Sequence, residues 1–232
     1  MSVEITFRLY YSEIVSKTDR GENMTLREIR LENKQRVVKT ALDYFVEKGI
    51  ERSRVSDIAK DSGLTERSVF RYFENKPALV LDALLYLWNS RITEMSNYFR
   101  DLEINDLTGK ERCLKILLAY GSLFMPSKKE LIFVEEAEVY LYRMNLQDKI
   151  KFDPLKPYVD GEGPLQKAIK KGIADGSIRD CEELEYFYNN CFDTLLGLLQ
   201  KLASGTYDID DNYQRKRIES LCKMLVNSIA NE

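Results

Sequence analysis

Histidine is absent from the 232-residue sequence, and this absence excludes more chemistry than any other feature of the composition. Without imidazole, the chain cannot form a Ser-His-Asp or Cys-His nucleophile pair, His-based acid–base catalysis or a zinc site that needs a nitrogen ligand. Glycine (11 residues) and proline (5) are sparse, which favours long helices over a turn-rich β fold. No apolar run approaches the roughly 18 residues that would span a bilayer. We therefore expect a helical protein that is not an enzyme and has no membrane segment.

Cysteine is also scarce, and the four residues form no CxxC pair. In a reducing compartment they are expected to be small buried hydrophobes; redox sensing is the alternative, and nothing in their spacing favours it. They are Cys113, Cys181, Cys191 and Cys222. The N-terminus lacks the basic and apolar regions of a secretory signal, so we expect a cytoplasmic protein. No pattern indicates catalytic residues, a metal site or a cofactor.

Charge is unevenly distributed along the chain. The net charge is −3, but residues 27–76 hold 12 Lys and Arg against 9 Asp and Glu, a local +3 that leaves −6 for the remainder. A basic module on an acidic body suits a protein that touches DNA at one end only.

The first 30 residues are assigned to an N-terminal extension. Val3, Ile5, Phe7 and Leu9 alternate as in a strand, but no later segment offers an evident β partner. Two readings remain open, an extension that packs on the body or translation that begins at Met24.

The apolar spacing after this extension predicts three helices around one small core. A stripe at i, i+3, i+4 and i+7 predicts the first helix, from about Thr25 to Lys48, and Gly49 ends it. A second helix follows with Ser53 as its expected N-cap, and Gly63 permits a positive φ at the next turn. Thr65 caps the third helix, whose outer face is polar. This layout predicts a helix-turn-helix, in which the last helix enters the major groove of DNA.

Every segment beyond residue 100 also has helical spacing. Gly176 is expected to close a short helix over 165–174, and residues 153–163, with two prolines, are expected to form a connection or a broken helix. Three further helices are expected to open at caps or capping boxes. The capping residues are Thr108 with Glu111, Ser127 with Glu130, and Asp180 with Glu183.

Two segments, VVKTALDYFVEKGI at 37–50 and VSDIAKDSGLTERSVFRYFENKPAL at 55–79, resemble the TetR family of bacterial transcriptional repressors. The family pattern has a first helix ending in an aromatic and a glycine, a V-x-x-I-A helix, a G-[VL]-[ST] turn and an F-x-[SN]-K-x-x-L tail. The sequence departs from it at Phe70, where tyrosine is frequent, at Glu66, where a small or basic residue is common, and at Arg54, where threonine or serine is usual.

The resemblance implies an all-α fold of about nine helices. Residues 31–90 would form a three-helix DNA-binding domain with its motif at about 54–73, joined through a fourth helix to a helical effector-binding and dimerisation domain over 91–232. The last two helices, about 181–203 and 211–230, would pair with their symmetry mates in a homodimer; the alternative is that they complete a monomeric core.

The resemblance and the helical spacing together select the candidate DNA contacts. Arg67 and Arg71 are expected to read guanine edges, and Glu66 a cytosine amino group. The side chains expected to reach phosphates, or either phosphates or bases, are Arg54, Tyr72 and Lys76, and Thr65 and Ser68. The alternative for each is an exposed side chain on a solvated helix.

The resemblance also implies an effector cavity in the middle helices. Aromatic and apolar side chains there would form a pocket for an apolar or planar small molecule, although core packing is an equally good account of them. They are Tyr120, Phe124, Phe133, Tyr140, Met144, Phe152 and Tyr158.

The function expected from this reading is a repressor that a small-molecule effector releases from a palindromic operator in double-stranded DNA. Two alternatives stay open. One is a DNA-binding adaptor without an effector, and the other is a helical small-molecule- or lipid-binding protein or enzyme with a chance helix-turn-helix resemblance.

Overall fold

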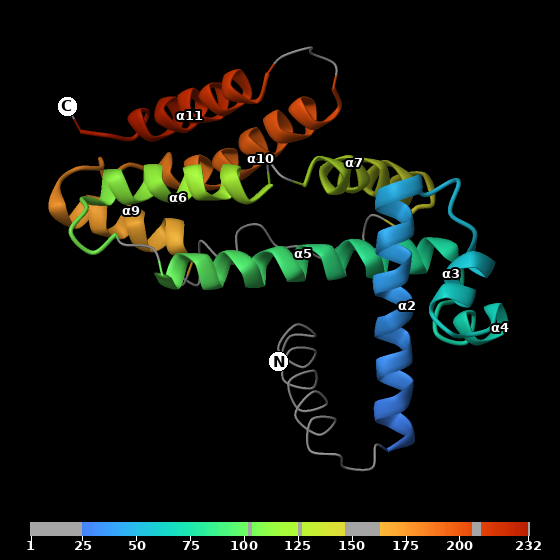
Figure 1. Cartoon of the computed structure of the whole chain (residues 1–232). Helices are drawn as coiled ribbons and strands as arrows, with labels where there is room; N and C mark the ends of the chain where they lie inside the picture. The colour runs from blue at the N-terminus through green and yellow to red at the C-terminus, as the bar shows by residue number, and fades with distance from the viewer. Residues whose placement is uncertain (1–24, 102–103, 125–126, 147–162, 206–209, 232) are drawn as a thin grey trace. The chain divides into compact units, whose positions relative to one another are not determined.

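The structure, a computed structural model, describes residues 25–101, 104–124, 127–146, 163–205 and 210–231. All regular elements in these ranges are α-helices, so the expected all-α class is confirmed (Figure 1). None of these helices combines the length and the hydropathy needed to cross a bilayer. The chain divides into two compact units, residues 1–83 and 84–232, and the boundary falls inside helix α5 (Lys76–Asp101).

The first unit begins, within the described residues, with the long helix α2 (Leu26–Lys48). Thr25 and Glu28 form a capping box, in which each side chain accepts a hydrogen bond from the other residue's backbone N–H. The helix ends at Gly49, whose φ is 80°, as predicted. The helix begins at Leu26, close to the start predicted at about Thr25, so residues 26–30 belong to α2 and not to the extension. The strand-like alternation from Val3 to Leu9 lies outside the described residues.

Short helix α3 (Val55–Asp61) packs against α2, and α4 (Glu66–Val69) packs against α3. The core they share is almost free of solvent exposure and includes Val37, Ala41, Phe45, Ile58, Val69 and Phe73. The prediction that Ser53 caps α3 is wrong. Ser53 is buried, and its hydroxyl donates instead to the carbonyl oxygens of Tyr44 (3.1 Å) and Gly49 (2.7 Å), so it fastens the connection to the end of α2.

The second unit is built around α6 (Gly109–Phe124), which packs along α9 (Pro164–Asp175) and also contacts α10 (Leu184–Ala203) and α11 (Asp211–Asn227). Helix α7 (Lys128–Arg143) lies against α10. Three of the four cysteines are completely buried in this core, one each on α6, α10 and α11. These core cysteines are Cys113, Cys191 and Cys222.

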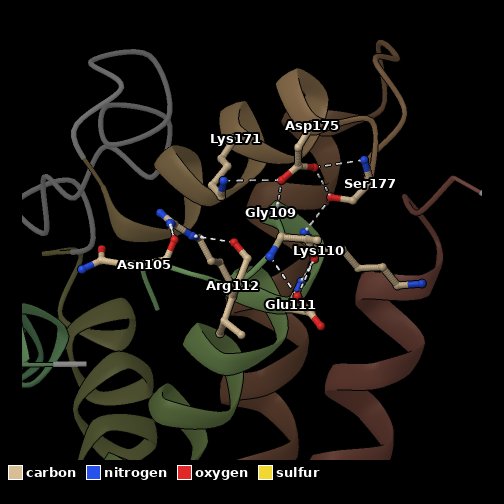
Figure 2. Close-up of polar contacts among 10 residues, drawn as sticks. Asn105, Gly109, Lys110, Glu111, Arg112, Lys171, Asp175 and Ser177 are labelled. Carbon is tan, nitrogen blue, oxygen red and sulfur yellow. Dashed lines mark hydrogen bonds and ion pairs between the residues drawn. The ribbon is translucent and has the colours of Figure 1, made fainter. Parts of the chain in front are cut away.

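The end of α9 and the connection that follows it form hydrogen bonds with the start of α6 and with the residues after α11. Gly176 closes α9 in the left-handed conformation (φ 77°), as predicted. The Asp175 carboxylate accepts the N–H of Gly109 (2.8 Å), and the Ser177 hydroxyl accepts that of Lys110 (3.1 Å), so this connection satisfies donors at the start of α6 (Figure 2). On its other side, the N–H of Arg179 donates to the Ile229 carbonyl oxygen beyond α11 (2.9 Å).

The predicted capping boxes of the second unit have different outcomes. Thr108 and Glu111 form one, with N–H to side-chain distances of 2.8 and 3.3 Å. Ser127 is the N-cap of α7 but makes no capping hydrogen bond, so that box is wrong. Asp180 does not open α10 either, because that helix begins three residues later than predicted, at Leu184, without a side-chain cap. Most of the expected connection at 153–163 lies outside the described residues.

Candidate nucleic-acid interface

The turn between α3 and α4 has the hydrogen bonds of a Schellman motif. The N–H of Gly63 donates to the Lys60 carbonyl oxygen (3.0 Å), and the N–H of Leu64 donates to that of Ala59 (2.9 Å). Gly63 has the positive φ predicted for it, 71°. The carbonyl oxygen of Ser62 in the same turn accepts a hydrogen bond from the Arg36 side chain of α2 (2.9 Å). The turn is therefore held by its own backbone hydrogen bonds and by α2.

A second contact fixes α3 to α2. The Tyr44 hydroxyl donates a hydrogen bond to the Asp61 carboxylate (2.5 Å). This bond, together with partial desolvation and the nearby negative charge, raises the pKa of Tyr44 to about 12. The packing angle of the helix-turn-helix against α2 is thus held by polar contacts at the surface as well as by the core.

Helix α4 is short and tightens at its end. Thr65 caps it as predicted, because its hydroxyl oxygen accepts the Ser68 N–H (3.2 Å). After Val69 the chain continues in turns with i→i−3 hydrogen bonds, such as Tyr72 N–H to the Val69 carbonyl oxygen (2.9 Å), rather than as regular helix. The candidate recognition segment, residues 66–72, therefore combines one helical turn with a tighter turn.

The charged side chains of this segment face solvent. Ser68 is half-buried, and its hydroxyl lies 3.0 Å from the Thr65 hydroxyl and accepts a hydrogen bond from the Arg71 guanidinium (3.0 Å). Arg71 is thus held along the helix surface before any ligand binds. Arg67 and Glu66 are exposed. Arginine offers five N–H donors in a planar fork, so Arg71 keeps donors for a second acceptor while it bonds Ser68.

The candidate phosphate contacts flank this segment. Arg54 is exposed at the N-terminal boundary of α3, and Tyr72 is half-buried. Lys76 is the first residue of α5, and its Nζ lies 3.5 Å from the Glu51 carbonyl oxygen. Asn75 caps α5, since its side-chain oxygen accepts the Ala78 N–H (2.9 Å). All eight side chains selected from the sequence thus lie between Arg54 and Lys76 in the first unit. The Thr65 hydroxyl already accepts a hydrogen bond as the cap of α4.

Two residues near this surface were missed in the selection from the sequence. Phe70 is 45% exposed although it is a large apolar side chain. Arg30 lies on α2, and its guanidinium carbon is 6.0 Å from the centre of the Tyr72 ring. The signal for Arg30 was present in the sequence, because it precedes the buried Val37 by seven residues, or two helical turns, and so shares its helix face.

The candidate effector residues that the structure describes come from two helices, α6 and α7, and the C-terminal end of α7. Phe133 is buried on α7, Tyr140 is half-buried, and Met144 is 46% exposed at the end of that helix. Tyr120 instead joins an edge-to-face series of aromatic rings from α5, α6 and α10, with ring centres 5.0–5.2 Å apart. Burial raises the pKa of the Tyr120 hydroxyl, and that of Tyr188 to about 12. This aromatic series consists of Phe99, Tyr120, Phe192 and Tyr188. The side chain of Phe124, and Phe152 and Tyr158, lie outside the described residues.

Helix α5 is fastened to α7 by one arginine. Arg91, on α5, donates to the Glu130 carboxylate and to the Ser127 hydroxyl (2.9 Å), and also forms an ion pair with Glu94 (2.6 Å). Glu130 is therefore paired with Arg91 rather than with the backbone of Ser127, which explains the missing capping box. Among the described residues, no His, Cys, Asp or Glu side chains gather in a group that could hold a metal ion.

Comparison with known sequences identifies relatives among bacterial regulators. Residues 37–83 match the family described as bacterial regulatory proteins, tetR family. The fatty acid metabolism regulator protein of Bacillus subtilis (strain 168) is 24% identical over 197 residues, which cover 84% of this chain and 95% of that protein. The uncharacterized HTH-type transcriptional regulator YerO of the same organism is 31% identical over 157 residues, or 63% of this chain and 52% of YerO.

Solved structures share the fold over most of the chain. The transcriptional regulator FadR from Bacillus subtilis, crystallised in complex with stearoyl-CoA, superposes with a TM-score of 0.60 at 20% identity and covers 84% of this chain and 98% of its own. A TetR-family regulator from Mesorhizobium loti superposes with a TM-score of 0.62 at 13% identity and covers 87% and 98%, respectively. The architecture expected from the sequence, a helix-turn-helix domain followed by a helical domain, is confirmed.

Proposed function

Because the chain belongs to the TetR family of bacterial regulatory proteins and is a DNA-binding regulator, we propose that it is a repressor that a small-molecule effector releases from a palindromic operator. The observation that carries the DNA-binding part is the exposure of Arg67 on α4 and of Arg71 in the turn that follows it. Thr65 caps α4, and the Schellman turn at Gly63 orients it. As a regulator of bacterial genes, it would act in the cytoplasm, and none of its known relatives cited above is named as an enzyme.

The proposed contacts divide into those that read the edges of bases and those that position the protein on the DNA backbone. Arg67 and Arg71 would donate to guanine N7 and O6, and Glu66 would accept from a cytosine amino group. Arg54, Tyr72 and Lys76 would contact phosphates at the edges of the groove. Ser68 would act through Arg71, whose guanidinium it holds.

The Lys76→Ala variant tests the positioning part. We expect weaker binding to all sequences and a shallower dependence of log K on log salt, by roughly one unit per lost phosphate contact. Fluorescence anisotropy at a series of salt concentrations measures the slope. A slope equal to that of the wild type would contradict the assignment of Lys76.

A homodimer is proposed because one helix-turn-helix contacts too few base pairs for genomic specificity. The inner faces of α10 and α11 are buried in the core of their own unit, as the monomeric alternative requires. Their outer faces nevertheless expose large apolar side chains, Tyr186 (67% exposed), Tyr213 (53%) and Met224 (68%). These side chains support pairing of the two helices with their symmetry mates, and sedimentation as a monomer at micromolar concentration would contradict it.

For the effector we propose a long-chain acyl thioester. The fatty acid metabolism regulator protein of B. subtilis matches most of the chain, and the structure of FadR from the same organism contains stearoyl-CoA. The described part of the second unit supports a long apolar ligand with the aromatic series centred on the partly buried Tyr120. An acyl chain would gain roughly 0.8 kcal/mol for each CH₂ it buries.

The effector would act through α5, which begins in the first unit and ends in the second. Lys76 starts this helix and Arg91 fastens its later part to α7. A ligand that binds better to one position of α5 would shift the population toward that position, and thereby change the spacing of the two recognition segments in a dimer.

A shift assay on the DNA upstream of the chain's own gene tests the proposal, with stearoyl-CoA as probe and free CoA as control. Specific binding that stearoyl-CoA abolishes and CoA does not is the expected result. Specific binding that neither compound affects would favour an adaptor without this effector. A lack of specific binding would favour a helical small-molecule- or lipid-binding protein instead.

A further inference from the structure

The face of α2 that packs on the helix-turn-helix changes in chemistry along its length. Val37, Ala41 and Phe45 are almost completely buried on it. Arg30 precedes Val37 by seven residues, which on a helix of 3.6 residues per turn is a rotation of about 20° from the same direction and a rise of roughly 10 Å. Lys34 lies between them on the same face. The face is therefore apolar beside the core and basic where α2 runs beyond it.

The opposite face of this part of α2 is acidic. Glu28 and Glu32 lie about 160° from Arg30 around the helix axis. The cationic side is thus directed toward the end of the recognition segment, where the Arg30 guanidinium lies 6.0 Å from the centre of the Tyr72 ring. At this distance the cation is attracted to the ring face.

Lys34 and Arg36, two other cations of this part of α2, have partners in the protein. Lys34 forms an ion pair with Asp82 of α5 (2.7 Å) and lies 5.3 Å from the centre of the Phe73 ring. Arg36 donates to the Ser62 carbonyl oxygen and to the Asn33 side chain. Arg30 is exposed, and within the described ranges no carboxylate forms an ion pair with it. Its charge is therefore available to an external anion.

We infer that Arg30 extends the DNA-binding surface onto α2 and contacts a backbone phosphate beside the groove that the recognition segment enters. The inference rests on the proposed function, because it places the Tyr72 end of that segment against DNA. The major groove is about 12 Å wide with phosphates along both rims, so a cation beside the end of a groove-bound helix lies near a rim. A phosphate contact positions the protein and does not read sequence.

The test measures the salt dependence of binding by the full chain for four proteins. Arg30→Gln keeps most of the stem and removes the charge, and Arg30→Lys keeps the charge. Lys39→Gln is the matched control, because Lys39 is also exposed on α2 and lies nine residues from Arg30, on the opposite side of the helix. We expect Arg30→Gln to reduce the slope of log K against log salt by about one unit for each protomer bound. Arg30→Lys and Lys39→Gln should keep the wild-type slope.

Ethylation interference on the same DNA gives an independent readout. One phosphate per half-site should interfere when ethylated with the wild type and not with Arg30→Gln. A wild-type slope for Arg30→Gln would overturn the inference, and if affinity also fell, Arg30 would act by positioning Tyr72. If the wild type bound no DNA at any salt concentration, the proposed function itself would fail and Arg30 with it, an outcome distinct from an unchanged slope.

Discussion

The close approach of α6 and α9 makes Gly109 the residue of the second unit where a single methyl group should do most harm. A Cβ at Gly109 would lie 2.0 Å from the backbone nitrogen and 2.1 Å from the Cα of Gly172, and 2.6 Å from the Ala168 carbonyl oxygen. All three are backbone atoms, so no side chain can rotate to make room. Gly109→Ala must therefore push the start of α6 away from α9.

The size of the effect follows from this geometry. Overpacking a core costs about 1–3 kcal/mol, and contacts this short with backbone belong at the upper end, so we expect a loss of about 3 kcal/mol in the free energy of unfolding. Separation would also weaken the hydrogen bonds from the N–H groups of Gly109 and Lys110 to Asp175 and Ser177 (Figure 2). For a unit of roughly 150 residues, 3 kcal/mol lowers the Tm by about 6–12 °C.

The assay is thermal unfolding of the full chain by circular dichroism, at fixed protein concentration. Gly197→Ala is the control, because Gly197 is also inside a helix but a Cβ there meets no atom within 4 Å in the protomer. That variant should gain about 0.5–1 kcal/mol from the better helix propensity of alanine. If Gly109→Ala melted at the wild-type temperature or above, the proposed packing of α6 on α9 would be refuted.

Three further predictions concern the DNA contacts, pH and thiol reactivity. Arg71→Ala should weaken specific binding by about 1–3 kcal/mol and relax the base preference at one position; an unchanged footprint would show that Arg71 reads no base. The raised pKa of Tyr44 means that its bond to Asp61 contributes stability below pH 10, and that this contribution is lost as the pH rises from about 10 to about 12. Unfolding midpoints across that range should fall more for the wild type than for Tyr44→Phe, and parallel curves would contradict this. Desolvation raises the pKa of all four cysteine thiols, but only Cys181 is partly exposed, so iodoacetamide should label Cys181 first. Equal labelling rates in the native protein would contradict the burial of the core cysteines.

The features that could be predicted from sequence are those that neighbouring residues determine. Thr65 caps α4 and Gly63 takes a positive φ because both depend on residues within one or two turns. The apolar spacing of α2 likewise predicts its buried face, since helix periodicity is local. These local rules are enough to place the helix-turn-helix and its exposed side chains.

The features that sequence patterns missed depend on partners far along the chain. Glu130 has the spacing of a capping box but is taken by Arg91, 39 residues earlier, because a charged guanidinium forms a stronger bond than a backbone N–H. No neighbouring residue requires glycine at position 109. The requirement comes from the backbone of Gly172, which leaves no room for a Cβ. Helix spacing places Arg30 on the same face of α2 as Val37, but the position of that face beside Tyr72 is a tertiary contact. Tertiary contacts decide each of these.

A footprint of the wild-type chain on the DNA upstream of its own gene tests the central claim most directly. The account predicts one protected segment with two-fold symmetry, whose half-sites are centred one or more helical turns apart. Protection of this segment should require a higher protein concentration for Arg71→Ala than for the wild type. Uniform cleavage across the region, at concentrations where the protein is folded, would contradict the claim that this chain regulates transcription through the surface from Arg54 to Lys76.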